Sequence, residues 1–356
     1  MKFGITLSQI NEVELVVRAE ELGYDFCWAW DSPMIRSNVW ALLARVADRT
    51  SRIALGPGVA VPGLAMTPVT ANAIATINAM APGRTFLGLG TGNTAMRAMG
   101  QLPTKIAAFE AHLKVIRGLL AGETVTYEAN GVREDIAFQS LELGHINLED
   151  PMPILVGGFG PLAQALAGEY GDGLITALPR GGTISEALAN VRVGAARAKR
   201  ALDNFETFAL VNLLLLRPGE TLRSARVLEE VGSSILVNIH FLYDRYREFG
   251  AEPPAFTAPI RAIWEEYVEF REKRDATRSF TEAHQSHYGH LDAAEARFVT
   301  PEVIRTFCIA GQPDEIVEQL SALESEGLAG INFIAPADRQ YEMCNEFAEA
   351  VISRMR

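Results

Sequence analysis

The chain has 356 residues, of which 48% are hydrophobic and 21% are charged, and its formal net charge at pH 7 is −12. This composition is typical of a globular protein with a large apolar core. Nucleic-acid binding needs clustered Lys and Arg, and no basic run occurs in the chain, so the charge argues against a nucleic-acid partner.

No segment of the sequence predicts secretion or membrane insertion. The N-terminus lacks the apolar region of a secretory signal, and no apolar run approaches the ~18 residues of a spanning helix. Cys27, Cys308 and Cys344 are too few and too scattered for a disulfide framework or a zinc site. We therefore expect a cytoplasmic protein without a membrane partner.

Strand and helix patterns alternate along the chain. Strands are expected at 3–7, 24–30, 52–61, the start of 84–93, 153–158, 173–178, 207–216 and 330–335. Apolar residues at helical spacing predict helices at 13–22, 39–46, 68–80, 106–120, 185–202 and 314–325. Pro68 and Pro161 each fall in the first turn of a predicted helix, where a missing N–H costs little.

Two segments break the alternation. Residues 122–150, with Asn130-Gly131, predict a hairpin-like excursion, and residues 218–300 predict a long helical insertion after strand seven. Eight mostly apolar strands alternating with helices indicate an α/β protein, a (β/α)8 TIM barrel forming a single domain over 1–356. A doubly wound open sheet is the alternative, but its Gly-x-Gly-x-x-Gly signature is missing.

The carboxyl ends of the strands are the expected location of the site. In a barrel these ends meet at one mouth, which holds the active site. Five of the predicted strands have notable carboxyl ends, at Asp31-Ser32, Gly58-Val59, Thr91-Gly92-Asn93, Gly157-Gly158-Phe159-Gly160 and Thr176-Ala177-Leu178. We expect these residues to converge.

Four motifs occur in an order typical of one family. They are SRIALGPGV at 51–59, PGRTFLGLGTGN at 82–93, ILVGGFGP at 154–161 and GDGLI at 171–175. Together they resemble the bacterial luciferase-like flavin-dependent oxidoreductases, and most closely the branch similar to methylenetetrahydromethanopterin reductases. The resemblance covers residues 1–216 and 311–336.

This resemblance implies a flavin-type cofactor, FMN or the deazaflavin coenzyme F-420, across the barrel mouth. It implies a non-proline cis peptide at Gly58-Val59 behind the ring system. The implied phosphate contacts are Gly157, Gly158, Phe159, Gly160, Thr176 and Ala177, and Thr91, Gly92 and Asn93 match the segment along the cofactor's polar edge. A net charge of −12 does not favour the acidic tail of F-420, so FMN is preferred, unless Arg97, Arg180 and Arg339 form a local basic patch.

Two residues are candidates for acid–base chemistry. Several relatives carry a catalytic histidine directly after the strand-two aspartate, but here that position is Ser32. Asp31 remains, either as a group that contacts cofactor or substrate or as a turn aspartate. His240 lies in an apolar stretch of the insertion and is either a buried core histidine or a catalyst.

The other histidines carry no assigned chemistry. His284, His287 and His290 resemble a metal cluster in their spacing, but the residues between them indicate a loop or a frayed helix, and no metal is expected. His112 and His145 are interpreted as structural.

The preferred function is a monooxygenase that uses reduced FMN and dioxygen on an apolar or aromatic small molecule, with a separate flavin reductase as a partner. The aromatic residues of 218–300 would form a lid over the site, unless they are core packing. The alternatives are hydride transfer with F-420 and a non-catalytic flavin-binding protein.

A homodimer is expected through an apolar helix face that includes Trp40, Leu42, Leu43 and Val46, unless this face packs on the barrel.

Overall fold

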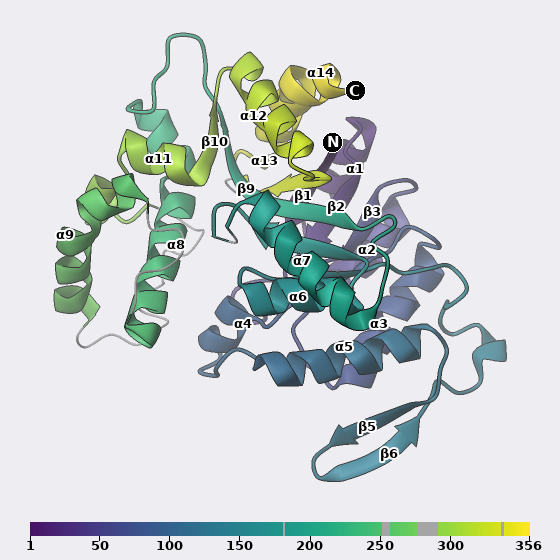
Figure 1. The fold of residues 1–356 in the computed structure, drawn as a ribbon. Coiled ribbons are helices and arrows are strands. Elements are labelled where there is room, and N and C mark those ends of the chain that lie inside the picture. The colour runs from purple at the N-terminus through teal and green to yellow at the C-terminus, as the bar shows by residue number, and fades with distance from the viewer. Residues whose placement is uncertain (181, 251–256, 276–290, 336–337) are drawn as a thin grey trace. The chain divides into compact units, whose positions relative to one another are not determined.

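The computed structural model describes residues 1–180, 182–250, 257–275, 291–335 and 338–356. Helices and strands alternate through these residues, as the sequence predicts (Figure 1). The chain forms two compact units. The N-terminal unit contains residues 2–176 and 186–208, and the C-terminal unit contains Met1 with residues 177–185 and 209–356.

Parallel strands form the sheet of the N-terminal unit. They are β1 (Lys2–Leu7), β2 (Phe26–Ala29), β3 (Ala54–Pro57), β4 (Leu87–Leu89), β7 (Ile154–Gly157) and β8 (Gly173–Ala177). β1 pairs with β2 and β2 with β3, while β4 pairs with β7 and β7 with β8. Parallel bridges from Leu55 to Thr85 and from Ala60 to Leu89 connect the β3 and β4 segments. Strands of such a sheet are buried on both faces, which explains their continuous apolar sequences.

Large aromatic rings are packed against glycines of neighbouring strands in this sheet. A β-carbon placed on Gly4 would lie 2.2 Å from Phe26 Cε2, and one on Gly58 would lie 2.4 Å from Trp28 Cγ. Phe26 also contacts Phe208, with ring centroids 5.1 Å apart. The glycines therefore leave the volume that the two aromatic rings of β2 occupy.

The strands of the N-terminal unit are connected mainly by helices. The helices are α1 (Val13–Glu21), α2 (Val39–Arg49), α3 (Thr67–Met80), α4 (Asn93–Ala98), α5 (Ile106–Leu120), α6 (Pro161–Tyr170) and α7 (Ile184–Ala198), whose first residues belong to the C-terminal unit. Pro68 and Pro161 lie in first turns, as predicted. Leu42, Leu43 and Val46 of α2 are buried within the chain, so the apolar face expected at a dimer contact packs inside the molecule.

The excursion at 122–150 contains the predicted hairpin. β5 (Val125–Ala129) pairs with β6 (Val132–Ile136) in antiparallel register, and the short helix η1 (Leu141–Leu143) follows. The turn residues Asn130 and Gly131 have φ values of 53° and 76°, as a two-residue hairpin turn requires. Figure 1 shows the hairpin projecting beyond α5.

The C-terminal unit combines strands with a group of helices. Its elements are β9 (Glu206–Leu215), whose first residues belong to the N-terminal unit, α8 (Ala225–Phe249), α9 (Ala258–Asp275), η2 (Ala296–Phe298), α11 (Pro301–Phe307), β10 (Cys308–Gly311), α12 (Pro313–Ser325), β11 (Gly330–Phe333), α13 (Gln340–Phe347), the π-helix η3 (Ala348–Ile352) and α14 (Ser353–Met355). β10 pairs in parallel with β9 and was not predicted. Its four residues lie directly between two helices, and so short a run has no strand periodicity that the sequence could reveal.

The aromatic residues of the insertion mostly pack with one another. α8 and α9 lie side by side (Figure 1), and Tyr243 meets Tyr267 edge to face with ring centroids 6.0 Å apart. Trp264 and Phe298 join the same buried cluster. Core packing thus accounts for these aromatics, and the lid stays a prediction.

Within the described ranges, no helix is both long enough and apolar enough to cross a bilayer. The three cysteines are buried and form no disulfide. His284, His287 and His290 lie outside the described residues.

Candidate active site

Three of the predicted strand ends converge on the side chain of Val59. The Gly58-Val59 peptide is cis, as the family resemblance predicted. A β-carbon placed on Gly90 would lie 2.6 Å from Val59 Cγ2, and one on Gly157 would lie 3.0 Å from Val59 Cγ1. The segments after β3, β4 and β7 can meet here only because Gly90 and Gly157 have no side chains.

Asp31 lies beside this convergence at the end of β2. The Val61 N–H donates to Asp31 Oδ2 over 3.4 Å, and the Val61 side chain packs against Gly92. Burial raises the pKa of Asp31 from 3.8 to about 6, although the hydrogen bond from Val61 acts in the opposite direction. Burial therefore brings the pKa of Asp31 closer to neutral pH than that of an ordinary aspartate.

The segment after β4 turns directly into a helix. Gly92 precedes α4 with a φ of 76°, which favours glycine, and Asn93 is the first helical residue. The Asn93 Oδ1 accepts a hydrogen bond from Arg97 Nε over 2.9 Å. The carbonyl oxygen of Thr91 accepts from the Thr104 N–H. Arg97 therefore orients the Asn93 side chain.

The loop after β7 leads into the N-terminus of α6. The Gly158 N–H donates to the Ile175 carbonyl over 3.0 Å, which holds the loop against β8. A β-carbon on Gly158 would lie 2.9 Å from Ala163 Cβ, whereas one on Gly160 would meet nothing within 4 Å. Phe159, between them, is 39% exposed. Gly160 is thus the position at which this loop has open space.

Two features of this region fit a phosphate group. Helix geometry leaves the first N–H groups of α6 without partners inside the helix, and no acidic side chain lies in its first turn. On the neighbouring strand, the Thr176 hydroxyl is buried and has no hydrogen-bond partner within the described residues. Ala177, the last residue of β8, is buried and belongs to the C-terminal unit.

His240 belongs to the core of the C-terminal unit. Its Nε2 lies 2.9 Å from Glu295 Oε1, and the Tyr267 hydroxyl donates to the same oxygen over 3.3 Å. Burial raises the pKa of Glu295, but the hydrogen bond with His240 and the charges of Arg271 and Arg274 outweigh it, and the pKa is lowered. These are the contacts of a buried core histidine, one of the two interpretations that the sequence allowed.

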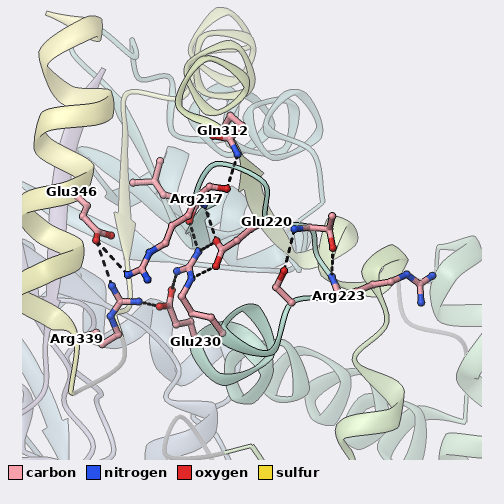
Figure 2. Close-up of polar contacts among 11 residues, drawn as sticks. Arg217, Glu220, Arg223, Glu230, Gln312, Arg339 and Glu346 are labelled. Atoms are coloured by element: carbon pink, nitrogen blue, oxygen red, sulfur yellow. Dashed lines mark hydrogen bonds and ion pairs between the residues drawn. The ribbon is translucent and has the colours of Figure 1, made fainter.

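Arg339 is surrounded by acidic side chains. Figure 2 shows it between Glu230 and Glu346, with which it forms ion pairs, and its Nε lies 2.7 Å from Glu342 Oε2. Glu230 also accepts from Arg226 NH1 over 2.7 Å. Because these acidic side chains neutralise the charge of Arg339, this residue does not contribute to the basic patch that was considered from the sequence.

Two residues beside the site were not predicted from the sequence. Thr6 on β1 and Trp28 on β2 are joined by a hydrogen bond, and Trp28 lies against Gly58. The sequence does show a large aromatic residue on one strand and a glycine at the end of a neighbouring strand. Predicting that the two are in contact, however, requires knowledge of the strand register.

Comparison with known proteins identifies the family. The model of the family described as luciferase-like monooxygenase matches residues 8–330. The 5,10-methylenetetrahydromethanopterin reductase of Archaeoglobus fulgidus is 28% identical over 93% of this chain and 92% of its own length. The F-420-dependent glucose-6-phosphate dehydrogenase of Amycolatopsis mediterranei is 25% identical over 97% of this chain and 94% of its own.

A solved structure has the same fold. The coenzyme F-420-dependent tetrahydromethanopterin reductase of Methanopyrus kandleri matches with a TM-score of 0.73 at 21% identity, over 100% of this chain and 99% of the other. The predicted (β/α)8 barrel is thereby confirmed. With its family model covering most of the chain, the protein belongs to the luciferase-like monooxygenase family and is an enzyme of the oxidoreductase class.

Proposed function

We propose that the protein is a coenzyme F-420-dependent oxidoreductase that transfers a hydride between the deazaflavin and a carbon atom of a small organic substrate. The supporting observation is that a relative matching nearly the whole chain is an F-420-dependent dehydrogenase. The solved structure with a TM-score of 0.73 is likewise named as F-420-dependent. This is the alternative from the sequence analysis, and the relatives favour it over FMN.

The net charge of −12, which favoured FMN in the sequence, is a property of the whole chain. Exposed charges more than about 8 Å from a ligand are largely screened at physiological ionic strength. Recognition of an acidic tail therefore depends on the groups next to it and not on the total. The net charge is weak evidence against F-420.

Residues of the N-terminal unit suit a phosphate-bearing cofactor. In this proposal the Thr176 hydroxyl and the first turn of α6 hold the phosphate, and the open space at Gly160 accommodates it. Val59 would contact the ring system, as the family resemblance implies. When bound, the deazaflavin supplies a carbon that donates or accepts a hydride.

Asp31 is the proposed acid–base group. Hydride transfer to a carbon bonded to oxygen or nitrogen is completed by proton transfer to that atom, and the reverse reaction removes the proton. Val61 donates to Oδ2 of Asp31, so Oδ1 is the oxygen that would carry the proton. With the pKa of Asp31 raised to about 6, both protonation states are accessible near neutral pH.

The test is a titration of the purified protein with F-420 and, separately, with FMN, followed by cofactor fluorescence. We expect F-420 to bind more tightly than FMN. Saturable binding of FMN together with no binding of F-420 would overturn the proposal. A Gly160→Val variant, which should block the phosphate without a clash in the protein, serves as the control for binding at this loop.

The second candidate is the FMN-dependent monooxygenase, with reduced FMN delivered by a separate flavin reductase. The description of the matching family as luciferase-like monooxygenase supports it. Oxygen consumption with reduced FMN and an organic substrate distinguishes this function from hydride transfer.

A further inference from the structure

A buried tryptophan connects the first strand to the cofactor-binding segment after the third. Thr6 and Trp28 lie opposite each other in the β1–β2 register, and Trp28 Nε1 donates to Thr6 Oγ1 over 3.1 Å. Trp28 is 1% exposed. Trp28 also contacts Gly58, where a β-carbon would lie 2.4 Å from Trp28 Cγ and 2.7 Å from Trp28 Cδ2. The indole is thus held on one side by a hydroxyl and touches the backbone of Gly58 on the other.

We propose that Thr6 and Trp28 are positioning residues for the cofactor, with the Thr6 hydroxyl setting the orientation of the indole and the indole setting the position of Gly58 and Val59. This inference rests on the proposed function, because it takes the Val59 segment to be the surface on which the cofactor ring lies.

The contacts around Gly58 explain why the indole orientation matters. The Gly58 N–H donates to the Ala29 carbonyl over 2.9 Å, which attaches this residue to β2. Trp28 lies on that same strand and contacts Gly58 directly, so the backbone cannot move toward the indole without a clash. Beyond Gly58, the Val59 side chain contacts Gly90 and Gly157. A shift of the indole would therefore displace the segment after β3 and, through Val59, the segments after β4 and β7.

The hydroxyl contributes more than volume. A buried indole N–H that loses its acceptor carries a desolvation cost, and the side chain reorients to find another partner. Valine has the shape of threonine but cannot accept this hydrogen bond, whereas serine can. Comparing the valine and serine variants therefore distinguishes the effect of losing the hydrogen bond from the effect of changing the packing.

The experiment compares the wild type with Thr6→Val, Thr6→Ser and Thr207→Val. Thr207 is also a buried threonine of the N-terminal unit, but its hydroxyl has no hydrogen-bond partner within the described residues, so its replacement controls for the removal of a buried hydroxyl. For each protein we would measure the Kd for F-420 by fluorescence, the Tm without cofactor and the near-ultraviolet circular dichroism of tryptophan.

We expect Thr6→Val to weaken F-420 binding about tenfold, the effect of losing one ordinary hydrogen bond, and to change the tryptophan dichroism. Thr6→Ser should restore most of the affinity, and Thr207→Val should bind as the wild type does. Unchanged affinity in Thr6→Val, or equal losses in Thr6→Val and Thr207→Val, would overturn the inference.

Failure of the proposed function gives a different result. If the wild type binds FMN and not F-420, the function is wrong, and the same comparison of variants with FMN decides the positioning role. If the wild type binds neither cofactor, both are overturned.

Discussion

The backbone N–H of Val61 lies 3.4 Å from Oδ2 of Asp31, and the side chain of the same valine packs against Gly92. One residue thus contacts the acidic group after β2 and the glycine turn after β4. This relationship places the candidate proton donor beside the segment expected along the cofactor's polar edge. Its consequences are testable through Asp31.

Replacing Asp31 by Asn should lower kcat at least about a hundredfold if Asp31 transfers a proton. In the wild type we expect the rate to depend on a group with an apparent pKa of about 6, and this dependence should vanish in Asp31→Asn. The measurement is a pH–rate profile with saturating cofactor. A mutant that keeps the wild-type rate and profile would exclude Asp31 from the chemistry.

The same substitution should stabilise the protein at alkaline pH. Between pH 3.8 and about 6 the carboxyl is protonated in the folded protein but ionised in the unfolded chain, so stability is lost as the pH rises through this window. Asp31→Asn removes that loss, and its Tm should exceed that of the wild type by about 3 °C at pH 8. Thermal denaturation at pH 4 and pH 8 checks this, since the difference should shrink at pH 4.

Gly158 and Gly160 should respond differently to substitution. A β-carbon on Gly158 would lie only 2.9 Å from Ala163 Cβ, whereas one on Gly160 would meet nothing within 4 Å. Overpacking of this kind costs about 1–3 kcal/mol, so Gly158→Val should lower the Tm. Gly160→Val should keep the Tm and weaken F-420 binding. Thermal denaturation and titration with F-420 of both variants test this difference. Equal losses of Tm in the two variants would contradict it.

Asp172 should stabilise the N-terminal unit in a pH-dependent way. Its carboxylate accepts from the Ile154 N–H over 3.0 Å and from Arg117 NH2 over 2.8 Å. Burial raises the pKa of Asp172, but the hydrogen bonds and the charges of Arg117 and Arg200 lower it below 3.8 overall. The stabilisation is therefore complete above pH 3.8 and is lost as the pH falls through the lowered value.

The Asp172 side chain is 36% exposed and water weakens its ion pairs, so Asp172→Asn should cost about 1 kcal/mol of unfolding free energy at pH 7. Urea denaturation at pH 7 measures it. The exposed Asp48 provides the control, and Asp48→Asn should change the free energy little. Equal effects of the two substitutions would show that the Asp172 contacts contribute nothing specific.

A homodimer remains our proposal, with α3 as its contact in place of the buried face of α2. α3 contains no charged residue, and Val69 and Met80, three helical turns apart, are 54% and 45% exposed. Because each copy carries a charge of −12, an uncharged face is where two copies would approach with the least repulsion. Val69→Glu should therefore produce a monomer in light scattering.

The control for this experiment is Val193→Glu. Val193 is 49% exposed on α7, a helix that carries charged residues, and the substitution should leave the molecular mass unchanged. A monomeric wild type at micromolar concentration would contradict the dimer.

Local features of the fold could be predicted because their causes lie close together in the sequence. Apolar runs between glycines predicted the strands, prolines marked the starts of α3 and α6, and Asn130-Gly131 predicted the hairpin turn. The four motifs predicted the family and the cis peptide at Gly58-Val59. Each of these depends on a few neighbouring residues and on the conformations that they allow.

Other properties depend on residues far apart in the chain and were decided by the tertiary structure. The contact of Val59 with Gly90 and Gly157 follows from strand pairing, and the raised pKa of Asp31 follows from burial that its neighbours in sequence do not reveal. Likewise, His240 could be assigned to the core only once Glu295, 55 residues later, was placed beside it. Periodicity specifies which face of an element is apolar, but packing alone determines what that face meets.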